Sequence, residues 1–313
     1  MKKINILLLA LCCCCAFDSI AQTDMDAIMM DKKQFCVGPM YSHSSWKNYW
    51  EGSFKRENLN IGTVATSAYS VMGNYGVSSK LNFLFSVPYI KTSASAGTMK
   101  GMKGIQDLSL FVKWMPIEKK WGPGTFSLYG IGGLSVPLTN YVADFLPLSI
   151  GLQSKTASIR LMLDYQINSW FATVAATYIQ RNNIKIDRTM YYTTTTHLSN
   201  EVEMPNASNI NFRAGYRSDK LIAEAVLNNF TTQGGFDISK NNMPFPSNKM
   251  NATTIGANIK YVVLPSHDLA VVAGANTAIA GRNVGQSTTV YGGLFYVMDF
   301  SSKKPVKNQP AKK

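Results

Sequence analysis

The sequence is short of cysteine once its first residues are set aside. Four of the five cysteines, Cys12 to Cys15, lie within an N-terminal apolar run, and only Cys36 follows it. That run, Ile4 to Phe17, comes after two lysines and before a stretch of small residues, which is the layout of a cleaved secretory signal over residues 1–21. The mature chain is therefore expected to begin at Gln22 and to form no internal disulfide.

The sequence also lacks the common membrane anchors. Lipid attachment would need a small residue before the modified cysteine, whereas Leu11 precedes Cys12 and only cysteines precede the others. After the signal segment no run reaches the roughly 18 apolar residues of a transmembrane helix. Membrane residence would therefore require a β-barrel.

Charge is scarce and mostly of one sign. Only 16% of residues are charged, the formal net charge is +13, and no Arg-rich helix or aromatic RNA-binding motif is present. Nucleic acid is therefore not an expected partner, although the basic excess would favour anions. The residues after Phe300 include five lysines and no acid, which predicts a basic disordered tail over residues 301–313.

Helical periodicity is scarce as well, and most of the chain alternates with a period of two. Ile159, Leu161 and Leu163, for example, alternate with Arg160 and Met162. This pattern predicts an all-β chain with about twelve strands. The expected strands are residues 35–46, 59–73, 79–91, 104–116, 124–138, 146–167, 170–180, 207–217, 220–231, 252–263, 269–279 and 286–300.

The connections between these strands distinguish a barrel from a water-soluble sandwich. Links after even-numbered strands are short, such as residues 168–169, and links after odd-numbered strands are mostly long, such as residues 181–206. Outer-membrane barrels have this asymmetry between periplasmic turns and extracellular loops. We therefore predict a transmembrane antiparallel up-and-down β-barrel over residues 35–300, in contact with outer-membrane lipid. Residues 22–34 and the basic tail would lie in the periplasm.

If the apolar faces meet lipid, the polar faces line the barrel lumen. An Arg or Lys facing the bilayer midplane would cost about 2 to 4 kcal/mol, which favours placing charges inside. The candidate lumen-lining residues are Asp107, Lys113, Arg160, Asp164, Arg213, Arg217, Glu224 and Lys260. Two roles are open for them: ion pairs that brace the barrel wall, and contacts with a solute.

Aromatic residues near the predicted strand ends fit the headgroup level of a bilayer. These are Trp46, Tyr49, Trp50, Trp114, Trp121 and Trp170. In a sandwich the same tryptophans would belong to the core. The last predicted strand ends in Phe300 and resembles the terminal strand of outer-membrane proteins, apart from the residues that follow it.

Catalytic and metal-binding patterns are missing. His43 and Ser44 could suggest the base and nucleophile of a barrel hydrolase, but adjacent residues on a strand point to opposite faces. His197 and His267 stand alone, without the ligands that a metal site needs. Glycine-rich segments lack the strand-to-helix context of a phosphate loop. We expect no enzyme activity, no cofactor and no metal.

One stretch resembles a known family. Its motifs are Tyr75-Gly76-Val77, Lys80-Leu81, Ser86-Val87-Pro88-Tyr89, Gly104-Ile105-Gln106-Asp107-Leu108-Ser109-Leu110, Lys113-Trp114 and Gly132-Gly133-Leu134-Ser135-Val136-Pro137. In this order they resemble outer-membrane transporter-like barrels of the MetA-pathway-of-phenol-degradation family, and the Gln22 start is similar to secreted proteins of the Bacteroidota. The resemblance implies transport of small, hydrophobic organic molecules and carries no catalytic residue. The polar inner faces fit a purely hydrophobic cargo poorly.

Two functions follow as hypotheses. The first is an outer-membrane channel or transporter for a small-molecule solute. The second is a structural or surface-interaction barrel whose long loops, residues 181–206 and 232–251, bind a partner. Solute flux through the reconstituted protein distinguishes them.

Overall fold

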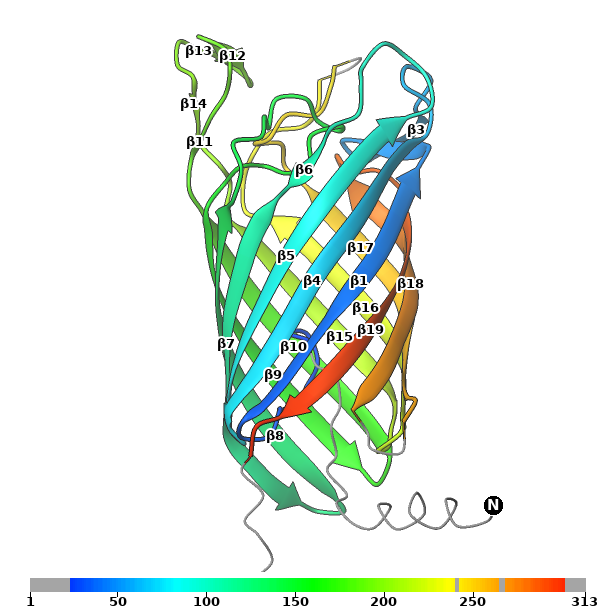
Figure 1. Ribbon diagram of the computed structural model, residues 1–313. Helices are drawn as coiled ribbons and strands as arrows, with labels where there is room; N and C mark the ends of the chain where they lie inside the picture. The colour runs from blue at the N-terminus through cyan, green and yellow to red at the C-terminus, as the bar shows by residue number, and fades with distance from the viewer. Residues whose placement is uncertain (1–22, 240–241, 265–267, 302–313) are drawn as a thin grey trace, which may run out of the picture.

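The computed structural model describes residues 23–239, 242–264 and 268–301, so the predicted signal segment and nearly all of the basic tail lie outside the described residues. Twelve long antiparallel strands close into a barrel (Figure 1), which confirms the predicted fold class. In chain order they are β1 (Gln34–Trp46), β4 (Val64–Ser78), β5 (Leu81–Ala94), β7 (Asp107–Trp121), β8 (Gly124–Pro137), β9 (Thr156–Ile167), β10 (Trp170–Arg181), β15 (Ala207–Arg217), β16 (Leu221–Thr232), β17 (Asn251–Val262), β18 (Leu269–Arg282) and β19 (Thr288–Asp299).

The barrel closes between its first and last strands. β1 pairs with β4 on one side and with β19 on the other, from Gln34 opposite Asp299 to Ser45 opposite Thr288. Closure is tight at Gly38, where a Cβ atom would collide with the main-chain oxygen of Leu294 in β19. Every long strand therefore has two neighbours, and the sheet has no open edge.

Short strands add to the loops and to one barrel strand. They are β2 (Asn48–Glu51), β3 (Phe54–Glu57), β6 (Lys103–Ile105), β11 (Ile184–Lys185), β12 (Tyr191–Tyr192), β13 (Thr196–His197) and β14 (Glu201–Val202). β6 pairs with β5 directly ahead of β7, so it extends the same position in the barrel. The pairs β11–β14 and β12–β13 form an extension that rises beyond the barrel (Figure 1).

The two rims differ as the sequence predicted. One rim, here called the short-turn rim, carries tight turns such as 122–123 and 168–169, in which Gly122 and Asn168 adopt left-handed φ values of 58° and 51°. Both ends of the barrel, Gln34 and Asp299, lie at this rim. The opposite rim, the long-loop rim, carries the longer connections, including residues 138–155, 182–206 and 233–250.

Most strand boundaries differ from the prediction by a few residues, and the largest difference is at the start of β9. β9 begins at Thr156 instead of residue 146, because Leu148 is fully buried beside Ile61 and Val64 within the loops of the long-loop rim. β4 spans Val64–Ser78 instead of residues 59–73, since the alternating outward face continues to its end.

Side-chain burial is inverted relative to a water-soluble barrel. Leu161 and Phe212 point outward and are 56% and 46% exposed, whereas Arg160 and Asp164, on the alternate face of the wall, are 9% and 4% exposed. Charge inside and apolar surface outside are what lipid requires. None of the described residues belongs to a helix long and apolar enough to cross a membrane.

The predicted aromatic residues divide between two environments. Trp114, Trp121 and Trp170 are more than half exposed on the outer surface, as expected of rings at a bilayer interface. Trp50 is instead buried against Gly281 among the loops of the long-loop rim, so its placement on the outer surface was wrong.

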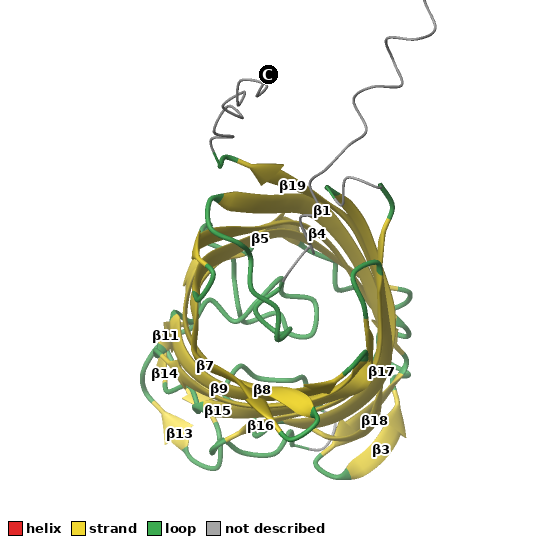
Figure 2. Cartoon of the chain, turned by 90° about the horizontal axis from the view of Figure 1, so that it is seen from below, coloured by secondary structure: helices red, strands yellow, loops and turns green. Residues whose placement is uncertain are grey.

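The N-terminal segment lies inside the barrel, in contrast to the periplasmic position predicted for residues 22–34. Viewed along the barrel, loop segments lie within the ring of strands (Figure 2). Side chains of the inner wall on β7, β8 and β9 bond to Thr23, Asp24, Asp26 and Ala27. The segment supplies acceptors for buried donors that would otherwise have no partner.

Replacing Leu161 by arginine tests the lipid-facing assignment. The change puts a charge at the middle of the outward face of β9, so the free energy of unfolding should fall by about 2 to 4 kcal/mol in liposomes, measured by urea titration and tryptophan fluorescence. The same substitution at Asn182, an exposed loop residue, is the control and should have little effect. Equal stability of the Leu161→Arg variant and the wild-type protein would contradict a lipid-facing position.

Candidate functional site

The candidate site is the barrel lumen, where most of the predicted charged residues meet the N-terminal segment. Seven of the eight either bind the N-terminal segment or line the lumen beside it. They are Lys113 on β7, Arg160 and Asp164 on β9, Arg213 and Arg217 on β15, Glu224 on β16 and Lys260 on β17. Asp107 stands apart, because it accepts a hydrogen bond of 2.6 Å from Tyr141 in a loop of the long-loop rim.

Lys113 is the main attachment of the N-terminal segment. Its side chain is fully buried, and its Nζ donates to the main-chain oxygens of Thr23 and Ile28 at 3.0 and 2.8 Å and to Asp26 Oδ1 at 3.0 Å. Three acceptors match the three hydrogens of an ammonium group. Asp26 also folds the segment into a compact turn, because its Oδ2 accepts from the main-chain nitrogen of Thr23 at 2.6 Å.

Arg160 and Tyr129 hold the neighbouring part of the segment. Arg160 Nη1 donates to the main-chain oxygen of Asp24 at 2.5 Å and to its Oδ2 at 3.0 Å, while Nε donates to Thr177. Tyr129 on β8 donates to the main-chain oxygen of Ala27 at 2.9 Å. Ala27 itself packs into an apolar cluster of the inner wall, so polar and apolar contacts act on one short segment.

The rest of the segment leaves the lumen along the inner wall toward β1. Met30 packs with Cys36, Val262 and Phe295. At the rim, a Cβ atom on Gly76 would collide with the main-chain oxygen of Asp31, so glycine is required where the segment passes β4.

A second polar network covers the opposite part of the wall. Arg213 Nη1 pairs with Glu224 Oε1 at 2.7 Å, and Asn258 Nδ2 donates to the same oxygen at 2.7 Å. Tyr291 on β19 donates to Asn258 Oδ1, which extends the chain of contacts from β15 to β19. Arg217 pairs with Asp164 at 3.0 Å and stacks over Phe171, with its Cζ 3.9 Å from the ring centre. Such contacts hold polar side chains in fixed positions around the lumen.

Two cavities lie beside the N-terminal segment. A vestibule of about 860 Å³ at the short-turn rim is bounded by residues of the segment and by β7, β8 and β9. A smaller inner cavity of about 230 Å³ lies between Thr23–Ile28 and the wall formed by β15 to β19, β1 and β4. Ile28 and Arg217 line both, so the two cavities adjoin.

The loops of the long-loop rim are packed against one another. Ile184, Ile186, Val202 and Met204 form a small buried cluster with Ala143. A second contact joins three loops through Asn283, whose side chain accepts from the main-chain nitrogens of Gly52 and Ile238 at 2.7 and 3.2 Å. Its Nδ2 also donates to Asp237 Oδ1 at 2.7 Å. These loops therefore form an ordered cap.

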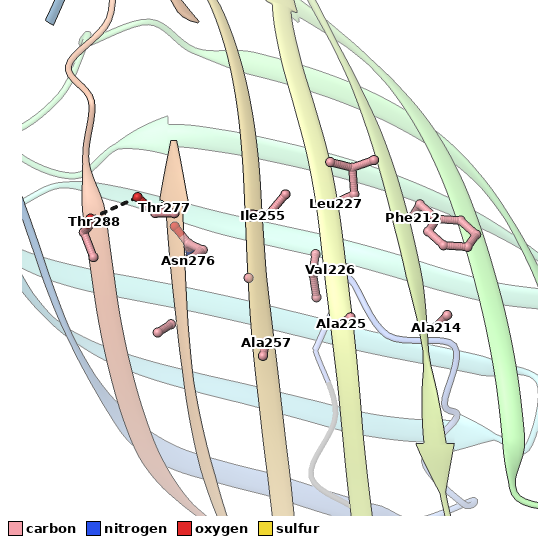
Figure 3. A pocket seen from close by; sticks show the side chains of 12 residues that line it. Phe212, Ala214, Ala225, Val226, Leu227, Ile255, Ala257, Asn276, Thr277 and Thr288 are labelled. Atoms are coloured by element: carbon pink, nitrogen blue, oxygen red, sulfur yellow. Dashed lines mark hydrogen bonds between the residues drawn. The ribbon is translucent and has the colours of Figure 1, made fainter. Parts of the chain in front are cut away.

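A depression of about 790 Å³ on the outer surface is separate from the lumen. Small residues such as Ala214, Ala225, Ala257 and Ala275 pair across β15 to β18, and larger ones such as Phe212 border them (Figure 3). Its surface is almost wholly apolar, and the four alanines lie on the same outward face of the wall as the exposed Phe212. The depression belongs to the lipid-facing surface.

The two histidines within the described residues, His43 and His197, do not form a site. His43 Nδ1 bonds to Ser67 Oγ at 3.0 Å, whereas Ser44 accepts from Thr289 on the other face of the strand. His197 stacks on Tyr191, with ring centres 4.6 Å apart, and His267 lies outside the described residues.

The sequence prediction missed the contribution of the N-terminal segment. The sequence feature that could have indicated this segment is the pair Asp24 and Asp26, two acids separated by one residue near the start of a basic chain. Asn258, Tyr129 and Tyr291 were also missed, because uncharged polar residues on an inner face are common in any barrel.

Comparisons with known proteins identify a family by sequence and similar barrels by structure. The sequence matches the profile of a family described as putative MetA-pathway of phenol degradation over residues 58–292. No curated protein matches the chain. The fold is similar to that of the COG4313 outer membrane channel from Pseudomonas putida F1, with a TM-score of 0.71 and 11% identity over 88% of this chain and 100% of that chain.

A more distant structure is the translocator domain of the autotransporter NalP from Neisseria meningitidis, with a TM-score of 0.44 and 10% identity over 87% of this chain and 90% of that one. The NanC porin has a TM-score of 0.44 and 8% identity over 82% of this chain and 98% of that one.

Replacing Lys113 by methionine should loosen the N-terminal segment. The change leaves Asp26 without its cation and removes the donor to two main-chain oxygens. Breaking a buried ion pair in this way costs about 3 to 5 kcal/mol. A cysteine at Ala27, in a Cys36→Ala background, should react with a maleimide at least about tenfold faster in the Lys113→Met variant.

Lys119→Met is the matched control, because Lys119 lies exposed on the same strand. Unchanged labelling in the Lys113→Met variant would show that Lys113 does not hold the segment.

Proposed function

Because the chain belongs to the family described as putative MetA-pathway of phenol degradation, we propose that it acts as an outer-membrane channel for small organic solutes. The short-turn rim would face the periplasm and the long-loop rim the exterior, in keeping with the usual arrangement of outer-membrane barrels. Outer-membrane lipid would surround the barrel.

The observation that carries the proposal is a polar lumen occupied by a short, separately attached segment. Thr23–Ile28 is held through a few hydrogen bonds and ion pairs to Lys113, Arg160 and Tyr129, whereas the wall is a continuous hydrogen-bonded sheet. The segment can therefore change its position at a far smaller free-energy cost than the wall. The adjoining vestibule and inner cavity give a solute space beside it.

The lining favours solutes that carry a polar group. Arginine, lysine and carboxylate side chains on the inner wall would solvate such a group, whereas a purely hydrophobic molecule would displace water from them without replacing its hydrogen bonds. We therefore propose small organic solutes with at least one polar or charged end, and no catalytic role.

A second candidate function has its own supporting observation. The extension built from β11–β14 and β12–β13 carries the exposed apolar residues Met190, Tyr192 and Leu198, of which Leu198 is 81% exposed. Exposed apolar side chains on a raised hairpin suit contact with a partner. A surface-interaction barrel would use this extension and would need no conduction.

Liposome swelling tests the channel proposal. The wild-type protein should admit small organic solutes slowly, and a variant lacking residues 23–28 should admit them faster, because the deletion removes the contents of the lumen. The Lys113→Met, Arg160→Met double variant, which keeps the chain length, should show the same direction of change. A barrel that resists SDS until boiled yet swells no liposome in any of these forms would favour the surface-interaction function.

A further inference from the structure

In the part of the chain that the structure describes, the cations and carboxylates around the N-terminal segment do not pair completely. Four ion pairs are present: Lys113–Asp26, Arg160–Asp24 and Arg217–Asp164, each at 3.0 Å, and Arg213–Glu224 at 2.7 Å. Each of these carboxylates already has its own cation. Lys260 is the remaining cation of this set.

Lys260 is buried without a hydrogen-bonding partner. Its side chain lies on the inner face of β17 and is 8% exposed, and its Nζ has no hydrogen-bond acceptor among the described residues. A buried ammonium group that has neither an acceptor nor a paired carboxylate is strongly unfavourable. An anion that reached this atom would recover much of that cost.

The inner cavity gives an anion access to Lys260, which lines it. Much of the remaining lining is apolar, from Met40 on β1, Met72 on β4, Ile222 on β16 and Val272 on β18. The cavity therefore combines one available positive charge with an apolar surround. Its volume of about 230 Å³ is below the roughly 300 to 1,000 Å³ of sites for drug-sized ligands.

We propose that the inner cavity is a binding site for a small monocarboxylate with a short apolar tail, the carboxylate bound to Lys260 and the tail against the methionine side chains.

The charge of the ligand follows from the other groups in the cavity. Asp24, Asp26 and Glu224 line it as well, and each is neutralised by its own cation. One additional negative charge completes the pairing of Lys260, whereas a second one would face three carboxylates. A monoanion therefore fits, and a phosphate dianion or a dicarboxylate does not.

The apolar tail follows from the walls. A neutral molecule of the same shape would leave Lys260 without an acceptor, and an inorganic anion would leave the apolar wall in contact with water. Burial of each methylene group against this wall strengthens binding by removing apolar surface from water. The ligand must therefore carry both a carboxylate and an apolar tail.

Binding at Lys260 is independent of conduction, but the identification of the monocarboxylate as a transported solute rests on the proposed channel function. Arg217 and Ile28 join the inner cavity to the vestibule, so a bound anion would lie next to an exit toward the short-turn rim. Binding and flux are accordingly measured separately.

The binding test uses the purified full chain in detergent, with sodium hexanoate as the probe. Millimolar hexanoate should raise the unfolding temperature of the wild-type protein. Hexanamide, which has the same length and no charge, should not. Lys260→Met should lower the affinity for hexanoate about tenfold to a hundredfold, as expected for loss of a hydrogen bond to a charged group.

Two controls keep the test decisive. Lys220→Met removes an exposed lysine near the short-turn rim and should bind hexanoate as the wild-type protein does. Without ligand, Lys260→Met should unfold at the wild-type temperature or above it, because an apolar side chain replaces an unpaired buried charge.

An equal hexanoate shift in the wild-type protein and Lys260→Met would overturn the proposal, and so would an equal shift with sodium chloride at the same concentration. Hexanoate entry into liposomes then tests the channel: binding without entry would refute transport while leaving the site in place, and entry without binding would refute the site alone.

Discussion

The structure depends on the hydrogen-bonded ladder between β1 and β19. A lipid environment offers no water to unpaired main-chain groups, and each one left open would cost several kcal/mol. Pairing from Gln34–Asp299 to Ser45–Thr288 joins the first and last strands, so the sheet of the described residues has no open edge. Once the wall is closed and its outer surface apolar, charged side chains can be accommodated only on the inner face.

Those inner charges determine what else the barrel contains. Lys113 and Arg160 are buried on the inner wall, and the N-terminal segment provides acceptors for both. The arginines of β15 pair instead with carboxylates of the wall itself, Glu224 on the adjacent β16 and Asp164 on β9. The two roles that the sequence left open, bracing the wall and meeting a solute, are therefore divided among the residues: most are paired with each other or with the segment, and Lys260 is available.

Much of the barrel could be predicted from the sequence because strands and turns depend on residues that are close together in the chain. The alternation of Ile159, Arg160 and Leu161 indicates a strand with one apolar and one polar face. The contrast between the short link 168–169 and the long link 182–206 indicates one rim of turns and one of loops. The position of the N-terminal segment could not be predicted in this way. Its contacts with Lys113 join residues 87 and 90 positions apart, and they depend on wall geometry that no local pattern encodes.

Loop packing could not be predicted either, because it too depends on contacts between residues far apart in the sequence. Trp50 was assigned to a bilayer interface because it is aromatic and near a strand end, yet it is buried against Gly281, far along the chain. Pro147 and Leu148 also extended an apparent strand that the structure replaces with loop. In each case a contact distant in sequence overrode a sound local preference.

The way the N-terminal segment is attached bears on how freely its sequence can vary. Four of its acceptors are main-chain oxygens, those of Thr23, Asp24, Ala27 and Ile28, which any residue supplies. Only the carboxylates of Asp24 and Asp26 are specific to their side chains. Apart from these two acids and the buried Ala27 and Met30, positions in the segment can therefore change without loss of docking, so that the surface presented to the lumen can diversify while the wall stays the same.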